Sequence, residues 1–215
     1  MRCCQCEGIE REFDAESAES EMDDYRAEGP VETTQFLIDA LTDQGVEGLT
    51  LLDIGGGVGA IQHAMLSAGA SAATAVEAST AFAKAAEDEA RELGWSEQVE
   101  VKQGDFVELA DTLPPHGIVT LDRVICCYHD MESLVGLSAA RASKLYGVVY
   151  PRYVWWNKIG FRVLNLFLWF SRSPFRTFVH PDAGVQSILD QVGLTRVFYR
   201  KTFFWQVAVY ARAEG

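Results

Sequence analysis

A glycine-rich loop is the part of the sequence with the clearest binding chemistry. Residues 51–60 read LLDIGGGVGA, so an apolar run that contains Asp53 leads into Gly55, Gly57 and Gly59. A turn from a strand into a helix leaves backbone N–H groups free at the helix N-terminus, where anionic or polar ligands are favoured. Glycine lets a ligand approach the backbone closely and permits positive φ. The pattern therefore predicts a ligand-binding loop.

Acidic residues follow the next two predicted strands. Glu77 ends the strand 72–77, about 20 residues after the glycine loop, where an acid contacts ribose hydroxyls in nucleotide-binding sheets. The third strand leads into QGDF, in which Asp105 precedes the aromatic ring of Phe106. A carboxylate at that point can accept a hydrogen bond from an adenine amino group. The ring beside it can cover the base, so a nucleoside ligand is predicted.

Two nucleoside cofactors fit the glycines. Gly55, Gly57 and Ala60 match the dinucleotide fingerprint, so an NAD(P)-dependent oxidoreductase is one alternative. No Lys-Ser/Thr pair follows the glycines, which excludes a phosphate-binding P-loop. Asp53 occupies a strand position where dinucleotide-binding sheets carry an apolar residue, and a carboxylate there can accept from a cationic amino group. Together with QGDF, it favours a different nucleoside.

The motifs together resemble the class I S-adenosylmethionine-dependent methyltransferases. LLDIGGGVGA, AVEAS, QGDF and LDRVICC occur in the order and spacing of that family, and the resemblance covers residues 31–212. It implies S-adenosyl-L-methionine as cofactor and S-adenosyl-L-homocysteine as product. It also implies cofactor contacts at Asp53, Gly55, Gly57 and Gly59 near the methionine part, Glu77 at the ribose, Asp105 and Phe106 at the adenine, and Asp122 near the sulfonium or the substrate.

The methyl acceptor should lie beside the end of the fourth strand. Methyl transfer is an in-line displacement that needs an aligned nucleophile and sometimes a base. Tyr128 and His129 are the predicted catalytic residues, and histidine has a suitable unperturbed pKa near 6.5. The alternative is that His129 caps the next helix and Tyr128 packs in the core. Residues 176–194 resemble the magnesium-protoporphyrin methyltransferases in part, but Cys127 stands where those enzymes carry a histidine.

Strands and helices alternate along most of the chain. This predicts an α/β fold with a three-layer, doubly wound sheet of seven strands, mostly parallel, that ends in an antiparallel hairpin. Strands are expected at 49–54, 72–77, 99–102, 118–126, 145–150, 196–202 and 204–212. Helices are expected at 31–44, 58–68, 79–93, 131–144 and 182–192.

Composition sets apart an acidic N-terminal segment, 1–30, with a cysteine-rich start, and an aromatic and basic insertion at 151–181. The resemblance implies that residues 31–215 are the methyltransferase domain that carries this insertion. The insertion is predicted to complete the core as a helical hairpin, to cover a small, apolar and anionic acceptor, or to contact a membrane peripherally. The last alternative admits a non-catalytic binding module. The formal net charge of −13 argues against a nucleic-acid partner.

The cysteines indicate a reducing environment. Their odd number and adjacent pairs do not form a disulfide framework, and no secretory signal is visible, so a cytoplasmic location is expected. Cys3, Cys4 and Cys6 could bind a soft metal, but three thiols within four residues are cramped. A disordered tail without a metal is the favoured interpretation. The sequence does not indicate an oligomeric state.

Overall fold

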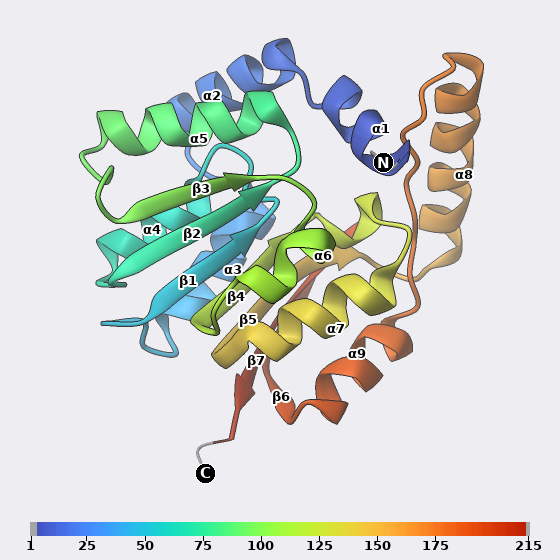
Figure 1. Ribbon diagram of the computed structural model, residues 1–215. Coiled ribbons are helices and arrows are strands. Elements are labelled where there is room, and N and C mark those ends of the chain that lie inside the picture. Colours follow the sequence, from blue (N-terminus) through green and yellow to red (C-terminus); the bar gives the residue numbers. More distant parts are fainter. Residues whose placement is uncertain (1–3, 214–215) are drawn as a thin grey trace.

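The sheet has seven strands in the order β3-β2-β1-β4-β5-β7-β6 (Figure 1). The structure, a computed structural model, describes residues 4–213, with side chains from Glu7 onward. Only β7 runs antiparallel to its neighbours. The strands are β1 (Thr50–Ile54), β2 (Ala72–Glu77), β3 (Val99–Gln103), β4 (His116–Asp122), β5 (Ala142–Pro151), β6 (Leu194–Lys201) and β7 (Trp205–Arg212). The predicted fold class is confirmed.

Helices cover both faces of the sheet. They are α1 (Cys4–Glu12), α2 (Ala15–Glu28), α3 (Glu32–Thr42), α4 (Ala60–Ser67), α5 (Thr80–Glu92), α6 (Phe106–Leu109), α7 (Met131–Arg141), α8 (Trp155–Phe170) and α9 (Asp182–Gln191). Two short 3₁₀ helices lie at Ala110–Thr112 and Ile125–Cys127. No helix among residues 4–213 is both long and apolar enough to cross a membrane.

The core consists of two apolar layers that sandwich the sheet. Leu51 and Leu52 are consecutive residues of β1, and each is fully buried in a different layer. This follows from the alternation of side chains along a strand. Leu37 of α3 packs in the layer of Leu51, whereas Leu134 of α7 packs in that of Leu52. Burial on both faces explains why the central strands β1 and β4 read as nearly continuous apolar runs.

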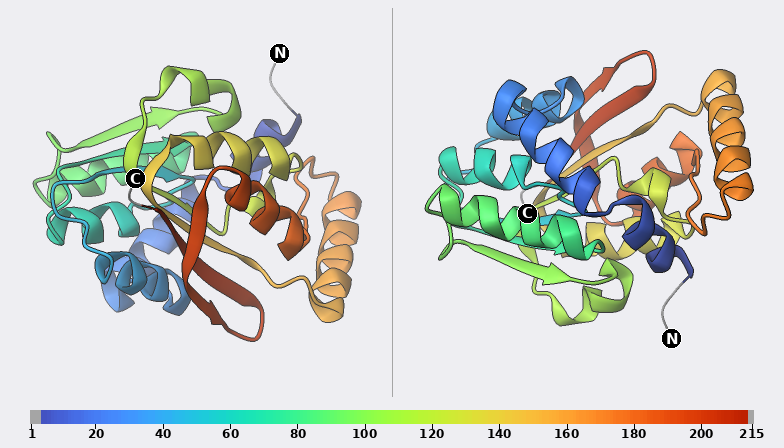
Figure 2. Two further views of the ribbon diagram at one scale, coloured as in Figure 1. Left: turned by 90° about the horizontal axis from the view of Figure 1, so that it is seen from below. Right: turned by 90° about the horizontal axis from the view of Figure 1, so that it is seen from above.

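The strand order reverses between β1 and β4, which are neighbours in the sheet. In doubly wound folds, ligands bind at such a reversal, outside the carboxyl ends of the strands. Viewed from above, α1 and α2 lie across the sheet (Figure 2). The acidic N-terminal segment therefore contributes helices beside the expected ligand edge.

Two strand limits differ from the prediction by more than two residues. The fourth strand was expected to reach residue 126, but β4 ends at Asp122, because Arg123 has a φ of 60° that turns the chain out of the extended conformation. The fifth strand begins at Ala142 rather than 145, because Ala142 is extended and pairs with His116.

The insertion at 151–181 forms one helix, α8, and an extended return, not a helical hairpin. The return runs along the end of β4. The Phe178 N–H donates to the Cys126 carbonyl at 2.8 Å, and His180 Nε2 lies 3.0 Å from the Tyr128 carbonyl oxygen. Cys4 and Cys6 belong to helix α1 and not to the expected disordered tail. Cys3 and the side chains of Cys4 and Cys6 lie outside the described residues, so the metal-free interpretation of these thiols stays a prediction.

Candidate functional site

A cavity of about 660 Å³ lies at the carboxyl edge of β1, β2 and β4. Small-molecule sites commonly have volumes of this size. Its walls come from the glycine loop, from the ends of the strands and from helices α1 to α3. Seven of the residues predicted as site residues line it, namely Gly55, Gly57, Glu77, Asp105, Phe106, Asp122 and Tyr128.

Asp53 supports the glycine loop from below. It is fully buried and does not belong to the cavity lining described here. Its carboxylate accepts hydrogen bonds from Thr120 Oγ1 at 2.7 Å and Gln62 Nε2 at 3.1 Å. Burial raises the pKa of Asp53 to about 6, against the effect of these two donors. Gly59, which precedes α4, is also outside this lining.

Glu77 is a buried carboxylate at the edge of the cavity. It accepts hydrogen bonds from the Ser79 N–H at 3.0 Å and from the Gly57 N–H at 3.3 Å. Gly57 has a φ of 57°, which favours glycine and aims its N–H at the acid. Burial raises the pKa of Glu77 to about 7, so these donors compensate only part of its desolvation. The Ala78 backbone also acts on the carboxylate, which has about four acceptor positions, so capacity remains for a ligand.

Asp105 and Tyr128 meet across the cavity. The Tyr128 hydroxyl donates to Asp105 Oδ2 at 3.0 Å, and Asp105 also accepts from the Val107 N–H as the cap of α6. Phe106 is buried next to them. His129 stacks on Tyr128 with ring centroids 5.3 Å apart, but it is exposed and outside the described lining.

The cap of α7 is Asp130, whose carboxylate accepts from the Ser133 N–H, so His129 does not take the capping role of the alternative interpretation. The structure therefore brings Tyr128 to the cavity and leaves His129 at the surface. The catalytic roles predicted for these two residues stay predictions.

Arg123 is the only cationic side chain among the described residues that line the cavity. Its Nε lies 3.3 Å from Asp122 Oδ1, and Asp122 also accepts a hydrogen bond from Thr34 Oγ1. A positive φ is uncommon for a residue with a side chain and is often found at functional sites. No sequence pattern predicts this conformation, and Arg123 was therefore not among the predicted site residues.

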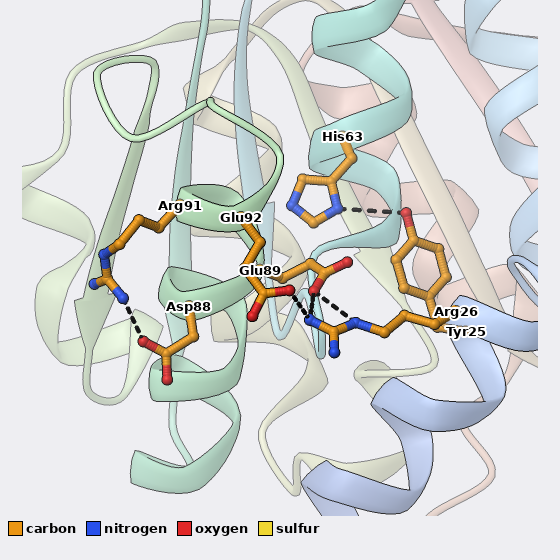
Figure 3. Close-up of polar contacts among 7 residues, drawn as sticks. All are labelled: Tyr25, Arg26, His63, Asp88, Glu89, Arg91 and Glu92. Atoms are coloured by element: carbon orange, nitrogen blue, oxygen red, sulfur yellow. Dashed lines mark hydrogen bonds and ion pairs between the residues drawn. The ribbon is translucent and has the colours of Figure 1, made fainter.

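Helix α2 is fastened beside the glycine loop by polar contacts with α4 and α5 (Figure 3). The Tyr25 hydroxyl lies 3.3 Å from His63 Nδ1. Arg26 donates to Glu89 through Nε at 2.9 Å, and it forms a second ion pair with Glu92 at 2.5 Å. These contacts join segments that are far apart in the sequence.

Glu21 of α2 faces the cavity close to the glycine loop. A Cβ on Gly57 would lie 2.8 Å from Glu21 Oε1. Burial is the main cause that raises the pKa of Glu21. The charge of Arg123 lowers this pKa, whereas the charges of Asp122 and Asp24 raise it further. Nothing in the acidic N-terminal sequence distinguishes Glu21 from its neighbours, so sequence reasoning missed it. No group of three or more potential ligands among the described side chains, which run from residue 7 to residue 213, could hold a metal ion.

The fold is that of a class I methyltransferase. Residues 6–143 match the family model described as O-methyltransferase domain. The chain therefore belongs to this family of S-adenosylmethionine-dependent methyltransferases, and the predicted class and cofactor are confirmed. No curated protein matches the sequence.

Solved structures share the fold at low sequence identity. Magnesium protoporphyrin IX methyltransferase from Synechocystis PCC 6803, with bound SAH, has a TM-score of 0.74 and 19% identity over 97% of this chain and 100% of that chain. The mitomycin 7-O-methyltransferase has a TM-score of 0.65 and 20% identity, with 95% and 60% covered. An O-methyltransferase family 2 protein from Planctomyces limnophilus, in complex with apigenin, has a TM-score of 0.60 and 14% identity, with 85% and 61% covered.

Proposed function

We propose that the protein methylates an oxygen atom of a small, fairly hydrophobic molecule. The observation that carries this proposal is a single cavity with two kinds of lining. Glu77 and Asp105 provide buried or half-buried carboxylates on one side, whereas Ile9, Phe13 and Val31 provide apolar surface from the N-terminal helices. One cavity can therefore hold a polar nucleoside beside an apolar acceptor.

The described residues fit the nucleoside cofactor. Backbone N–H donors offset only part of the desolvation of the buried Glu77 carboxylate. This carboxylate would therefore accept further hydrogen bonds from ribose hydroxyls. Asp105 and Phe106 would hold the adenine, and Gly55 and Gly57 would let the methionine part approach the backbone. Asp53 would act through the loop, because its carboxylate is bonded to Gln62 and Thr120. When bound, the cofactor supplies the methyl group.

Arg123 and Glu21 are the charged groups suited to act on the acceptor. The guanidinium of Arg123 would attract a carboxylate or phenolate, and charge-assisted hydrogen bonds are stronger than neutral ones. Glu21, whose pKa is raised by burial, would accept the proton that an acceptor hydroxyl loses. The Tyr128 hydroxyl, which is hydrogen-bonded to Asp105, would position the acceptor where it meets the cofactor. Two of the similar solved structures support an apolar acceptor. One is a magnesium protoporphyrin IX methyltransferase, and the other is in complex with apigenin.

Radiolabelled methyl transfer tests the proposal. The purified protein and S-adenosyl-L-methionine would be incubated with aromatic carboxylic acids, phenols and their neutral amide counterparts. Methylation of the acidic acceptors at oxygen is expected. Binding of S-adenosyl-L-homocysteine without transfer to any oxygen would contradict the O-methyltransferase assignment, whereas loss of binding itself would contradict the cofactor site.

A charge variant tests the acceptor class. Arg123→Gln should raise KM for an anionic acceptor by about tenfold or more, because a hydrogen bond to a charged group contributes about 1.5–3 kcal/mol. The inhibition constant of the matching neutral amide should change little. Arg91→Gln makes the same chemical change on the exposed side of α5 and is the control.

A buried thiol and the charge of the chain bear on its surroundings. Cys126 is a free cysteine in the core, which supports the proposed cytoplasmic location. The net charge of −13 supports a small-molecule substrate over a nucleic acid.

A further inference from the structure

Helix α8 turns its apolar face away from the protein. Of its residues, only Asn157 and Phe161 are buried. Trp155, Phe167 and Phe170 keep 68%, 67% and 69% of their surface exposed. Residues at three- or four-residue spacing share one side of a helix. The side chains that follow this spacing outward form a stripe that we call the α8 face, and they are Trp155, Ile159, Val163, Leu166, Phe167 and Phe170.

The inner side of α8 is held by polar contacts that fix its orientation. Asn157 Nδ2 donates to the Arg152 carbonyl at 2.9 Å and to the Phe204 carbonyl at 2.8 Å. Asn165 Oδ1 accepts from the Thr177 N–H at 2.8 Å, and its Nδ2 donates back to the Thr177 carbonyl at 2.7 Å. A helix with its amides anchored inward and its large apolar residues outward has a surface suited to a partner.

The exposed surface continues onto the hairpin between β6 and β7. Phe203 is 76% exposed and stacks on Trp156, with ring centroids 5.6 Å apart. In Figures 1 and 2, α8 lies at the periphery of the molecule in every view. No residue of 151–181 occurs in the lining of the cavity as the structure describes it, so α8 is not a wall of the proposed active site.

Positive charge accompanies the α8 face. Residues 133–181 contain no acid, although the net charge of the chain is −13. Arg162 is exposed on α8, and the Lys158 ammonium lies 3.3 Å from the centroid of the Tyr153 ring near the start of the helix. Arg172 is exposed just after the helix. The apolar stripe is thus bordered by cations in a protein that is otherwise acidic.

We propose that the α8 face docks on an anionic lipid bilayer, with the helix axis parallel to the membrane plane. Interfacial helices combine Trp, Phe and Leu on one side with Lys or Arg at the border. The 16 residues of α8 extend over about 24 Å, which suits a helix lying on a bilayer and is short of the ~30 Å needed to cross the hydrocarbon.

Charge favours lipid over a second copy of the chain as the occupant. In a twofold dimer, the same surface meets itself. The cations around the α8 face would then oppose one another without an acid from the same segment to pair with, and like-charge contacts across an interface are unfavourable. Anionic headgroups supply the opposite charge, while the acyl region receives the aromatic rings.

Vesicle co-sedimentation of the full chain tests the proposal. We expect the protein to pellet with vesicles of 70% phosphatidylcholine and 30% phosphatidylglycerol, and several-fold less with pure phosphatidylcholine. Ile159→Glu and Phe167→Glu should each lower the bound fraction at least fivefold. Val197→Glu places the same charge on the edge strand β6, where Val197 is 47% exposed, and should bind like the wild type.

Three results would overturn the proposal. They are failure of the wild type to bind the anionic vesicles, equal binding of the α8 variants, and a wild-type dimer that Phe167→Glu converts into a monomer by light scattering. Binding of S-adenosyl-L-homocysteine verifies that each variant is folded. Membrane docking does not depend on the identity of the methyl acceptor, so it can fail while the proposed function holds.

Discussion

The two walls of the cavity are built in different ways. The sheet wall consists of the glycine loop and the ends of β2 and β3, where backbone N–H groups meet the carboxylates of Glu77 and Asp105. The helical wall consists of α1, α2 and the start of α3, with apolar residues such as Phe13 and polar contacts such as that of Tyr25 with His63.

The sheet wall is fixed by neighbours along and across parallel strands, whereas the helical wall is attached by side chains from remote segments. In our proposal, the sheet wall holds the nucleoside cofactor, and the helical wall holds the acceptor. Changes in the sheet wall should therefore affect cofactor binding, and changes in the helical wall should affect the acceptor first.

Glu77→Ala should have the largest effect on the sheet wall. Loss of a hydrogen bond to a charged group costs about 1.5–3 kcal/mol, which lowers the affinity for S-adenosyl-L-homocysteine roughly 10- to 150-fold. Isothermal titration calorimetry measures it. Glu100→Ala removes an exposed acid of β3 and is the matched control. Unchanged affinity in Glu77→Ala would refute the ribose assignment.

Gly56→Ala should break the support of the sheet wall. An added Cβ would lie 2.6 Å from Gln62 Nε2 and still closer to the Asp53 carboxylate, two buried groups that hydrogen-bond each other. Overpacking of this kind costs about 1–3 kcal/mol of stability. Gly160→Ala on α8 meets no atom within 4 Å and should leave stability unchanged or slightly higher. Thermal unfolding measures the stability of both variants. Equal melting temperatures of Gly56→Ala and Gly160→Ala would contradict the expectation.

The pKa of Glu77 predicts how cofactor binding depends on pH. Burial raises this pKa to about 7, and the ionised carboxylate is the form that accepts donors from a ligand. Affinity should therefore fall by up to about tenfold per pH unit below pH 7. Calorimetry between pH 5.5 and 8 measures this, and Glu77→Gln should remove this dependence. A slope that persists in Glu77→Gln would assign the titration to another group.

The raised pKa of Glu77 affects the stability of the unliganded protein in the opposite direction, so stability falls as the pH rises. Because the folded pKa of Glu77 lies above its ordinary value of 4.5, the contribution of Glu77 to stability is complete below pH 4.5. This contribution is lost as the pH rises through 7. At pH 8, unliganded Glu77→Gln should therefore melt at a higher temperature than the wild type.

Tyr25→Phe should have the smallest effect, because it changes only the attachment of the helical wall. Loss of the contact between the Tyr25 hydroxyl and His63 costs about 0.5–1.5 kcal/mol. The KM of the acceptor should rise severalfold, whereas the affinity for S-adenosyl-L-homocysteine should stay within about twofold. Steady-state kinetics with both substrates varied measures the split. A loss in cofactor affinity alone would show that α2 belongs functionally to the sheet wall.

The sequence predicted well which residues at the ends of strands line the cavity. Glycines, Glu77, Asp105 and Asp122 follow short apolar runs, and a parallel sheet necessarily collects the ends of its strands at one edge. Glu21 and Arg123 were missed for a physical reason. Glu21 reaches the cavity only because α2 docks on remote helices, and Arg123 depends on a backbone turn that no local pattern specifies.

The orientation of α8 shows the same limit. Its composition left a core hairpin, a lid and a membrane contact open, because periodicity defines an apolar stripe but not the direction in which it points. The inward hydrogen bonds of Asn157 and Asn165 determine that direction, and their partners lie in other segments.

The return after α8 links the proposed membrane surface to the proposed active site. Through Phe178 and His180 it is hydrogen-bonded to the backbone at Cys126 and Tyr128, beside the cavity. A docked α8 would hold the cavity at a short, fixed height above the lipid. For an acceptor that dissolves in the bilayer, the reaction rate would then follow its mole fraction in the membrane, and dilution of the whole suspension at constant lipid composition would change the rate little.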